Sequence, residues 1–408
     1  MTPYLFDISR LIARAGAGPM TGIDRVELAY FRELLRRDAP VFFISRMPKS
    51  YALLDRAGGE NVLDKIEGRT DWGEAGILRH LIPRHSKTQQ SAISDLRKLA
   101  ISTCAYWRLS YCLRDVFPSG VTYVNVGHAN LRTEMFEAVK QNTNSRIIVL
   151  IHDIIPITYP DLSRQDVSRR FAQDVLRVAQ FADLLIYNSQ ETRQQTERWL
   201  TPRLRIPKAI VAHIGSEISA VHGGDFTAAS HKPNFICAGT IEPRKNHILL
   251  LNIWHRFCAE LPQEAVPDLH IVGRRGWNNE QVFKILDQDP MIGRHVFEHK
   301  NCDDAQYQML LTESWGLLFP SIAEGFGLPL IEAAARGVPI ICGENAIYHE
   351  ILGNYPLYLN VDNSYLWGQG ILERAGRKRE SEVDRKVRGK SVNLPDWQGH
   401  FDQIFRFI

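Results

Sequence analysis

Two glutamates, Glu324 and Glu332, are separated by seven residues that include a Gly-Phe-Gly segment at 325–327. The apolar run 316–319 predicts a strand just before them, and Pro329 is typical of the first turn of a helix. Both carboxylates are therefore expected at the carboxyl end of a parallel sheet, where such sheets bind ligands. Helix N–H groups there can hold oxygen atoms, and carboxylates accept hydrogen bonds from paired hydroxyls. The spacing predicts a polyol site; the alternative is a plain helix N-terminus whose dipole Glu332 compensates.

A pair of cations, Arg244 and Lys245, follows another apolar run at 234–238 and precedes a helical pattern at 247–257. Cations on such a loop, beside a helix N-terminus, are suited to a diphosphate. A nucleoside diphosphate that departs as a leaving group gains negative charge in the transition state. Fixed cations stabilise that state more than the ground state. The alternative is a solvated basic loop.

His152 follows the predicted strand 146–151, again at a carboxyl end. A neutral imidazole can donate a hydrogen bond to a sugar hydroxyl or accept one from it, and it need not act as a base. The alternative is a core histidine bonded to Asp153. Ser189, which follows a further strand at 184–188, is interpreted as an ordinary helix N-cap without a catalytic role.

The elements that must position these residues alternate along the chain. Short β-rich runs are separated by helical patterns, which favours α/β units with parallel sheets. Near-continuous Val, Ile and Leu content suits strands that are covered on both faces. A helix is expected from Ile23 to Arg37, with Thr21 as its N-cap. The predicted strands are residues 4–8, 41–45, 121–126, 146–151, 184–188, 210–214, 234–238, 269–272, 316–319 and 338–342.

The stretch 215–233 is the best candidate for a domain boundary, because it contains Gly, Ser and Thr without a helical or strand period. We expect a first Rossmann-like domain at 1–215, a linker at 216–233 and a second Rossmann-like domain at 234–390. The tail 391–408 has a helix-like apolar face and is expected to cross back onto the first domain.

The composition excludes several classes of protein. The 408 residues are 44% apolar and 23% charged with a formal charge of +3, which excludes a disordered chain and does not indicate a nucleic-acid binder. No apolar run reaches the roughly 18 residues of a membrane span, and the first ten residues do not predict a signal peptide. The six cysteines have no regular spacing, so reduced structural thiols in a cytoplasmic protein are expected.

One segment departs from this charge balance. Residues 75–115 carry seven Lys and Arg against two Asp, interleaved with apolar and aromatic residues. This basic amphipathic insert predicts peripheral docking on the anionic inner face of the cytoplasmic membrane, where each Lys or Arg is worth about 1 kcal/mol. A solvated helical face is the alternative.

Together these motifs resemble glycosyltransferase family 4, the retaining glycosyltransferases of GT-B architecture in bacterial polysaccharide synthesis. The resemblance rests on the Glu324-x7-Glu332 motif and on the stretches 239–246, 151–156 and 21–26. It implies two Rossmann-like domains that face each other across a cleft, with the nucleotide sugar on the C-terminal domain and the acceptor on the N-terminal domain. One departure is Thr240, where many relatives carry an arginine directly after the glycine.

The resemblance implies transfer of a hexosyl group, with retention of configuration, from a nucleoside-diphosphate sugar to a glycan or lipid-linked acceptor; GDP-mannose is the expected donor. In front-side attack the departing phosphate accepts the acceptor's proton, so no protein base is needed. The resemblance assigns Arg244 and Lys245 to the diphosphate, Glu332 to the ribose, Glu324 to sugar hydroxyls and His152 to orienting the sugar. Further donor contacts are expected from Gly18, Gly22, Thr240, Gly273, Gly325, Phe326 and Gly327, and the base pocket from 272–273 and 299–303.

Other chemistries fit less well. The glycines in 16–22 are spaced one residue wider than a dinucleotide-binding fingerprint and enclose Pro19, so a loop whose backbone approaches the donor phosphate is favoured over an oxidoreductase. The segment 287–289 looks like an Asp-x-Asp metal clamp but closes a helical pattern, and neither a metal nor another cofactor is expected. No motif supports a hydrolase nucleophile. The remaining alternatives are a GT-B epimerase or phosphorylase and a non-catalytic nucleotide-sugar-binding protein.

Overall fold

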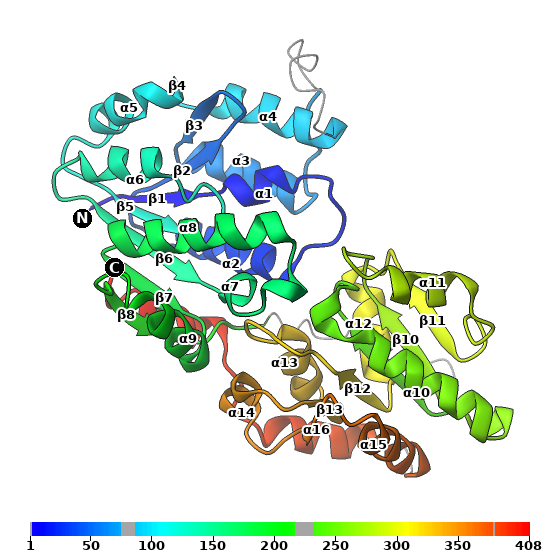
Figure 1. Ribbon diagram of the computed structural model, residues 1–408. Helices are drawn as coiled ribbons and strands as arrows, with labels where there is room; N and C mark the ends of the chain where they lie inside the picture. The colour runs from blue at the N-terminus through cyan, green and yellow to red at the C-terminus, as the bar shows by residue number, and fades with distance from the viewer. Residues whose placement is uncertain (1, 75–85, 217–231, 378–379) are drawn as a thin grey trace.

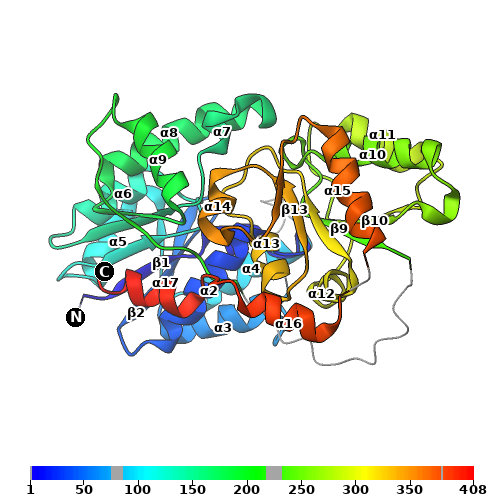
Figure 2. The same ribbon diagram turned by 90° about the horizontal axis from the view of Figure 1, so that it is seen from below.

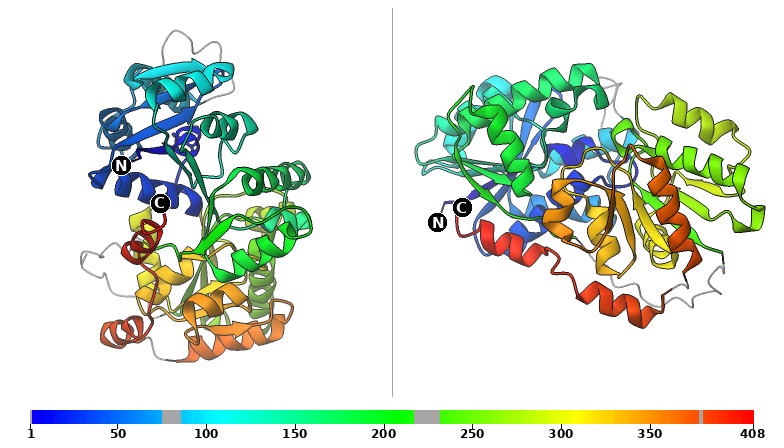
Figure 3. Two further views of the ribbon diagram at one scale, coloured as in Figure 1. Left: turned by 90° about the vertical axis from the view of Figure 1, so that its left-hand side faces the viewer. Right: turned by 60° about the horizontal axis from the view of Figure 1, so that its bottom comes forward.

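The computed structural model describes residues 2–74, 86–216, 232–377 and 380–408 and has two α/β units, each built around one sheet (Figure 1). The first unit contains the strands up to residue 211 and the second those from residue 234. Figure 3 shows the units one above the other, with helices on both faces of each sheet. Most of the expected linker at 216–233 lies outside the described residues.

The first unit holds an eight-stranded sheet in the order β4-β3-β2-β1-β5-β6-β7-β8. Strands β1, β2 and β5 to β8 run parallel, whereas β3 is antiparallel to both neighbours. The central strands are buried on both faces, which agrees with their near-continuous apolar sequences. The strands are β1 (Tyr4–Asp7), β2 (Val41–Arg46), β3 (Ser50–Leu54), β4 (Ser102–Ala105), β5 (Thr122–Asn125), β6 (Arg146–Ile151), β7 (Leu184–Tyr187) and β8 (Lys208–Val211).

Helices connect and cover these strands. Thr21 caps α2 as expected: its hydroxyl accepts from the Asp24 amide at 3.4 Å, and the Asp24 carboxylate accepts from the Thr21 amide at 2.7 Å. The helices of this unit are α1 (Ser9–Ala13), α2 (Gly22–Arg36), α3 (Arg56–Ile66), α4 (Lys87–Leu99), α5 (Leu109–Val116), α6 (Thr133–Lys140), α7 (Ile155–Thr158), α8 (Gln165–Phe181) and α9 (Gln190–Leu200).

The second unit has a six-stranded, wholly parallel sheet in the order β11-β10-β9-β12-β13-β14. Its strands are β9 (Asn234–Ala238), β10 (Asp268–Val272), β11 (Val296–His299), β12 (Gly316–Phe319), β13 (Ile340–Gly343) and β14 (Leu357–Leu359). Its helices are α10 (His247–Glu260), α11 (Glu280–Gln288), α12 (Asp304–Glu313), α13 (Leu328–Ala335), α14 (Ala346–Leu352), α15 (Ser364–Gly376) and α16 (Glu382–Lys390). As expected, the 287–289 segment closes α11 rather than a strand.

The predicted parallel sheets are confirmed, except that one edge of the first sheet is antiparallel. Strands β3 and β4 pair antiparallel there, and the sequence did not predict them as strands. Strand β4 is Ser-Thr-Cys-Ala and is mostly half-buried, so it lacks the apolar run that marks the central strands. The described part of the basic insert, residues 86–115, therefore includes an edge strand as well as α4 and most of α5.

The last helix, α17 (Trp397–Ile404), packs on the first unit, beside α2 and β1 (Figure 2). The Phe401 ring lies 5.1 Å from the ring of Tyr30, and the Tyr30 hydroxyl donates to His400 Nε2 at 2.8 Å. Tyr30 is almost fully buried by this contact and by the core. No helix in the described ranges combines the length and apolarity needed to cross a membrane.

Candidate functional site

The loops that follow β6, β7 and β12 meet where the two units contact each other. The Asn188 side-chain amide donates to the carbonyl of His152 at 2.8 Å and to the carbonyl of Gly325 at 3.1 Å. A Cβ on Gly325 would lie 2.8 Å from both that His152 oxygen and Asp153 Oδ2. Glycine is therefore required at 325, because this backbone lies directly against the first unit. The contact brings the predicted His152 and Glu324 regions together.

Arg244 and Lys245 form a buried ion cluster with two glutamates. Glu324 contacts Arg244 Nη1 at 2.9 Å and Lys245 Nζ at 2.5 Å, and Glu242 contacts Arg244 Nε at 2.6 Å. Burial opposes ionisation of Glu324, but the charges of Arg244 and Lys245 lower its pKa to about 2. Burial lowers the pKa of Lys245, and Glu324 partly offsets this effect. The cluster holds two positive and two negative charges, so it is balanced in this structure.

The cluster depends on the turn between β9 and α10. Residues Pro243–Lys245 form one 3-10 turn, and Asn246 then adopts a left-handed conformation with φ of 53° before α10 begins. Gly273 ends the neighbouring strand, and a Cβ there would lie 2.0 Å from the Gly239 carbonyl oxygen. Thr240 lies in this same crowded turn, with its methyl group 2.9 Å from the position of a Cβ on Gly276.

His152 is buried, and its ring Nε2 lies 2.7 Å from the carbonyl of Val126. The carbonyl can only accept, so Nε2 carries the hydrogen and Nδ1 is the acceptor. Burial lowers the pKa of His152 to about 4, which keeps the ring neutral at pH 7. The alternative of a histidine bonded to Asp153 does not apply, because Asp153 instead accepts from the amide of Ile155.

Glu332 is bound by a residue to which the sequence analysis gave no role. Arg25, on α2 of the first unit, contacts Glu332 at 2.6 Å and Asp304 at 2.7 Å. The Glu332 side chain is only 2% exposed, and burial raises its pKa while Arg25 opposes the rise. Arg25 lies in the 21–26 motif, and this motif was the one sequence signal that could have pointed to Arg25 as a site residue. Its pairing across 307 residues of sequence could not be read from that motif.

The remaining predicted residues are three glycines and Phe326, which lie in or beside the loops that begin α2 and α13. A Cβ on Gly22 would lie 3.5 Å from Leu328, so the start of α2 faces the start of α13. Gly18 lies in a loop with open space around it, and Gly327 has φ of 95° and precedes α13. Phe326 is buried. Ser189 caps α9 through the amide of Thr192, as its interpretation as an N-cap requires.

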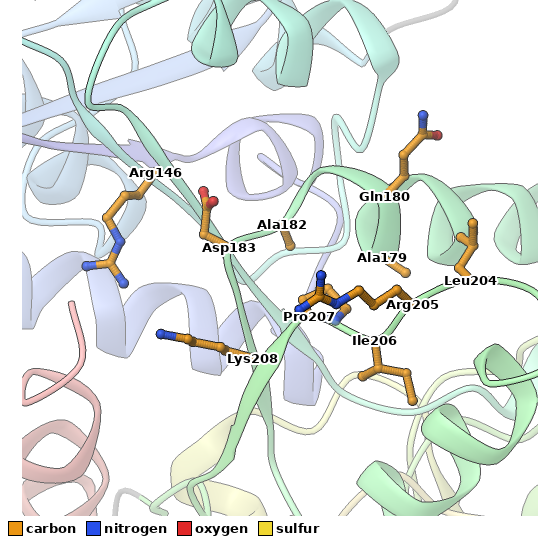
Figure 4. Close-up of a pocket in the computed structure, with 10 residues that line it drawn as sticks. All are labelled: Arg146, Ala179, Gln180, Ala182, Asp183, Leu204, Arg205, Ile206, Pro207 and Lys208. Carbon is orange, nitrogen blue, oxygen red and sulfur yellow. The ribbon is translucent and has the colours of Figure 1, made fainter.

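Each unit also has a cavity among its described residues. One, of about 780 Å³, is lined by residues at the amino ends of β6, β7 and β8, including Arg146, Asp183 and Lys208 (Figure 4). It therefore lies at the opposite edge of the first sheet from His152. The other, of about 330 Å³, is lined by His299, Cys302 and their neighbours and overlaps the segment 299–303 expected to form the base pocket.

Each of the two units contains a stretch that matches the profile of a known protein family. Residues 225–362 match the profile of the family described as Glycosyl transferases group 1. We call this matched stretch the group 1 domain. The group 1 domain contains Arg244, Lys245, Glu324 and Glu332, and the resemblance seen in the sequence motifs is confirmed at the level of this domain. Residues 125–199 match the Glucosyltransferase 3-like N-terminal domain.

Curated relatives align with about half of the chain. The chain is 29% identical over 226 residues to the serotype-specific mannosyltransferase WbdA of Escherichia coli, an alignment that covers 52% of this chain and 27% of WbdA. It is 25% identical over 228 residues to the O-antigen chain mannosyltransferase RfbU of Salmonella typhimurium (strain LT2), which covers 55% and 59% of the two chains. The chain thus spans less than two thirds of the length of either relative.

Solved structures establish the fold. The Anabaena protein HepE, solved in complex with UDP and glucose, aligns with a TM-score of 0.66 and 15% identity over 100% of this chain and 99% of its own. A sucrose-phosphate synthase from Thermosynechococcus elongatus aligns with a TM-score of 0.61 and 13% identity over 100% and 98%. The fold is GT-B, which confirms the fold class predicted from the sequence.

Proposed function

We propose that this protein is a retaining glycosyltransferase that moves a hexose from a nucleotide sugar to a glycan or lipid-linked acceptor in bacterial surface polysaccharide synthesis. The observation that carries the proposal is that the loop of His152 meets the loop of Glu324, which holds Arg244 and Lys245, at the contact between the two units. The group 1 domain and the GT-B fold support the same reaction. The mannosyltransferase names of WbdA and RfbU favour GDP-mannose as donor.

Arg244 and Lys245 bind the diphosphate of the donor in this proposal. Glu324 contacts both cations and, together with Glu242, balances their charge and holds them in place in the structure. A bound diphosphate supplies negative charge to the same cations and thereby frees carboxylate oxygens of Glu324 for sugar hydroxyls. Because the charge of the leaving group grows during transfer, the two cations lower the barrier more than they strengthen ground-state binding.

His152 orients the sugar by accepting a hydrogen bond at Nδ1. Its other nitrogen donates to the Val126 carbonyl, and the neutral ring has no second proton to give. The acceptor attacks the face from which the diphosphate departs, so configuration is retained, and the departing phosphate takes the proton of the acceptor, so no protein base is needed. Since the side-chain cations are present at the site, we propose that the reaction needs no metal ion.

Glu332 is assigned to the ribose hydroxyls. One of its oxygens is bonded to Arg25 in the structure, so the donor either shares the carboxylate with Arg25 or displaces it. Loop residues Gly18 and Gly22 approach the phosphates from the first unit in this proposal. Thr240, Gly273, Gly325, Phe326 and Gly327 complete the donor contacts.

The test compares Lys245→Ala with Lys208→Ala, which removes an exposed lysine at the opposite edge of the first sheet. Consumption of GDP-mannose should fall by about 10²–10³-fold in Lys245→Ala and stay unchanged in Lys208→Ala. Wild-type consumption by Lys245→Ala would overturn the assignment.

Calorimetric titration with GDP-, UDP- and dTDP-sugars identifies the nucleobase of the donor. Mass analysis of products from the donor alone separates an epimerase, which needs no acceptor.

We further propose that the protein works at the cytoplasmic face of the membrane, docked through the basic insert. Trp107 and Tyr111 are 79% and 65% exposed, and the guanidinium groups of Arg108 and Arg114 lie 5.5 and 4.9 Å from their respective ring centres. Exposed aromatic rings beside cations suit the headgroup region of an anionic bilayer. The wild type should sediment with anionic liposomes at low salt, and a variant carrying Trp107→Ala and Arg108→Gln should not. Absence of wild-type binding would end this proposal.

A further inference from the structure

A second group of cations lies between the two units, apart from Arg244 and Lys245. Arg10, on α1, contacts Asp24 at 2.6 Å, and Arg14 contacts the other oxygen of Asp24 at 3.1 Å. From the second unit, Arg274 follows Gly273 at the end of β10 and donates to the carbonyl of Ala17 at 3.4 Å. The three guanidinium groups thus surround one loop of the first unit, residues 14–20.

The charge of this group is not balanced. Asp24 is the carboxylate that pairs with Arg10 and Arg14, and Arg274 makes no ion pair with any residue that the structure describes. Another nearby carboxyl, Glu27, is buried and accepts from the Leu11 amide; burial raises its pKa well above the ordinary value, and it forms no ion pair with these guanidinium groups among the described residues. Among the ion pairs of the described residues, these three positive charges thus share one carboxylate, which leaves positive charge in excess.

This excess contrasts with the balanced cluster around Lys245. Arg14 and Arg10 also act electrostatically on Arg274: partial burial lowers the pKa of Arg274, the two like charges lower it further, and Asp24 and Glu242 oppose this effect. Holding like charges together is unfavourable unless an anion joins them. Among the described residues at the contact between the units, the excess positive charge therefore lies at Arg10, Arg14 and Arg274.

The donors of the three residues are available to a ligand. The side chains of Arg10 and Arg14 are 25% and 22% exposed, and Arg274 is exposed. Arg10 and Arg14 each use Nε and Nη2 within the protein, which leaves their Nη1 groups without a partner among the described residues. Planar guanidinium forks of this kind match the oxygens of a phosphate.

We propose that Arg10, Arg14 and Arg274 form a phosphate-binding subsite that spans the two units and is separate from Arg244 and Lys245. The inference rests on the proposed function, which supplies two sources of phosphate. One is the diphosphate of the donor. The other is a phosphate carried by the acceptor, as in a phosphorylated sugar or a lipid diphosphate.

The probes are GDP and inorganic pyrophosphate, titrated by calorimetry into the full chain. If the subsite holds the donor, Arg274→Gln and Arg14→Gln should each weaken GDP binding by about tenfold. If it holds the acceptor, GDP binding stays unchanged, and pyrophosphate binding to the GDP-saturated protein weakens by about tenfold. Unchanged affinity for both probes in both variants would overturn the proposal.

Two further variants keep the result interpretable. Arg36→Gln removes the same charge from an exposed position at the far end of α2 and should change neither affinity. Arg274→Lys keeps the charge but loses the fork, and its affinity should lie between those of the wild type and Arg274→Gln. Binding is measured without turnover, so failure of glycosyl transfer with every donor would reject the proposed function and leave the subsite result standing.

Discussion

Gly325→Ala tests whether the contact between the units positions the reacting groups. The added Cβ would lie 2.8 Å from the His152 carbonyl oxygen, 2.8 Å from Asp153 Oδ2 and 3.0 Å from Asp153 Cβ. Favourable contacts between such atoms require about 3.5 Å, so the loop after β12 must move away by roughly 0.5–1 Å. The His152 oxygen belongs to the backbone and cannot rotate away.

A displacement of this size at a reacting centre costs on the order of 10–100-fold in rate. We therefore expect kcat/KM to fall 10–100-fold, which corresponds to about 1.4–2.7 kcal/mol of lost transition-state stabilisation. Overpacking also lowers the free energy of unfolding, typically by about 1–3 kcal/mol. Because the two sheets lie on opposite sides of the contact, both should remain folded.

The assay measures release of the nucleoside diphosphate at a subsaturating donor concentration. Circular dichroism confirms that Gly325→Ala and its control variant are folded. Gly376→Ala is the matched control, because Gly376 is the last residue of α15 and a Cβ there has no atom within 4 Å. It should behave as the wild type. A Gly325→Ala enzyme with wild-type kcat/KM would refute the view that a close approach at this glycine sets the active geometry.

Three further predictions concern titration and ion pairing. Burial lowers the pKa of His152 to about 4 and that of His247 to about 3, so the unfolded chain binds protons first as the pH falls below about 6.5. Tm in scanning calorimetry should therefore decrease steadily from pH 6.5 to pH 4, and a constant Tm over that range contradicts the burial argument. A hydrogen bond with Cys104 lowers the pKa of the Cys112 thiol. Iodoacetamide at pH 7 should modify Cys112 ahead of the other cysteines by peptide mapping, and Cys104→Ala should slow that modification. Arg25→Ala removes the cation that contacts the buried Glu332 carboxylate and leaves only the weaker influence of Arg336, so urea titration should show a loss of about 1–3 kcal/mol in unfolding free energy that Arg25→Lys partly restores.

Local signals explain what could be predicted from the sequence. The apolar runs that end before Glu324, Lys245 and His152 predicted three strand ends, and parallel strands bring their carboxyl ends to one edge. The pairing of Glu324 with both cations was not predicted, because no local pattern reports contacts between loops about 80 residues apart. The Arg25–Glu332 pair crosses between the units and is invisible to helical periodicity for the same reason.

The sequence analysis failed to predict the edge strand β4 for a different reason. Strand β4 has a short, polar sequence and is defined by its hydrogen bonds to β3 rather than by burial of its own side chains. Asn188 was noticed only as the end of a strand, although its amide joins two backbone carbonyls from different units. A single polar residue at a strand end does not reveal which carbonyls it will meet.

The return of α17 to the first unit affects the order in which the protein folds during synthesis. The ribosome makes the first sheet, then the whole second unit, and only then Phe401 and its neighbours. Until that point Tyr30 and the surface of α2 lack the partner that covers them. The first unit is therefore completed last, after the second unit has had time to fold, and a fragment ending at residue 216 should expose an apolar face and aggregate.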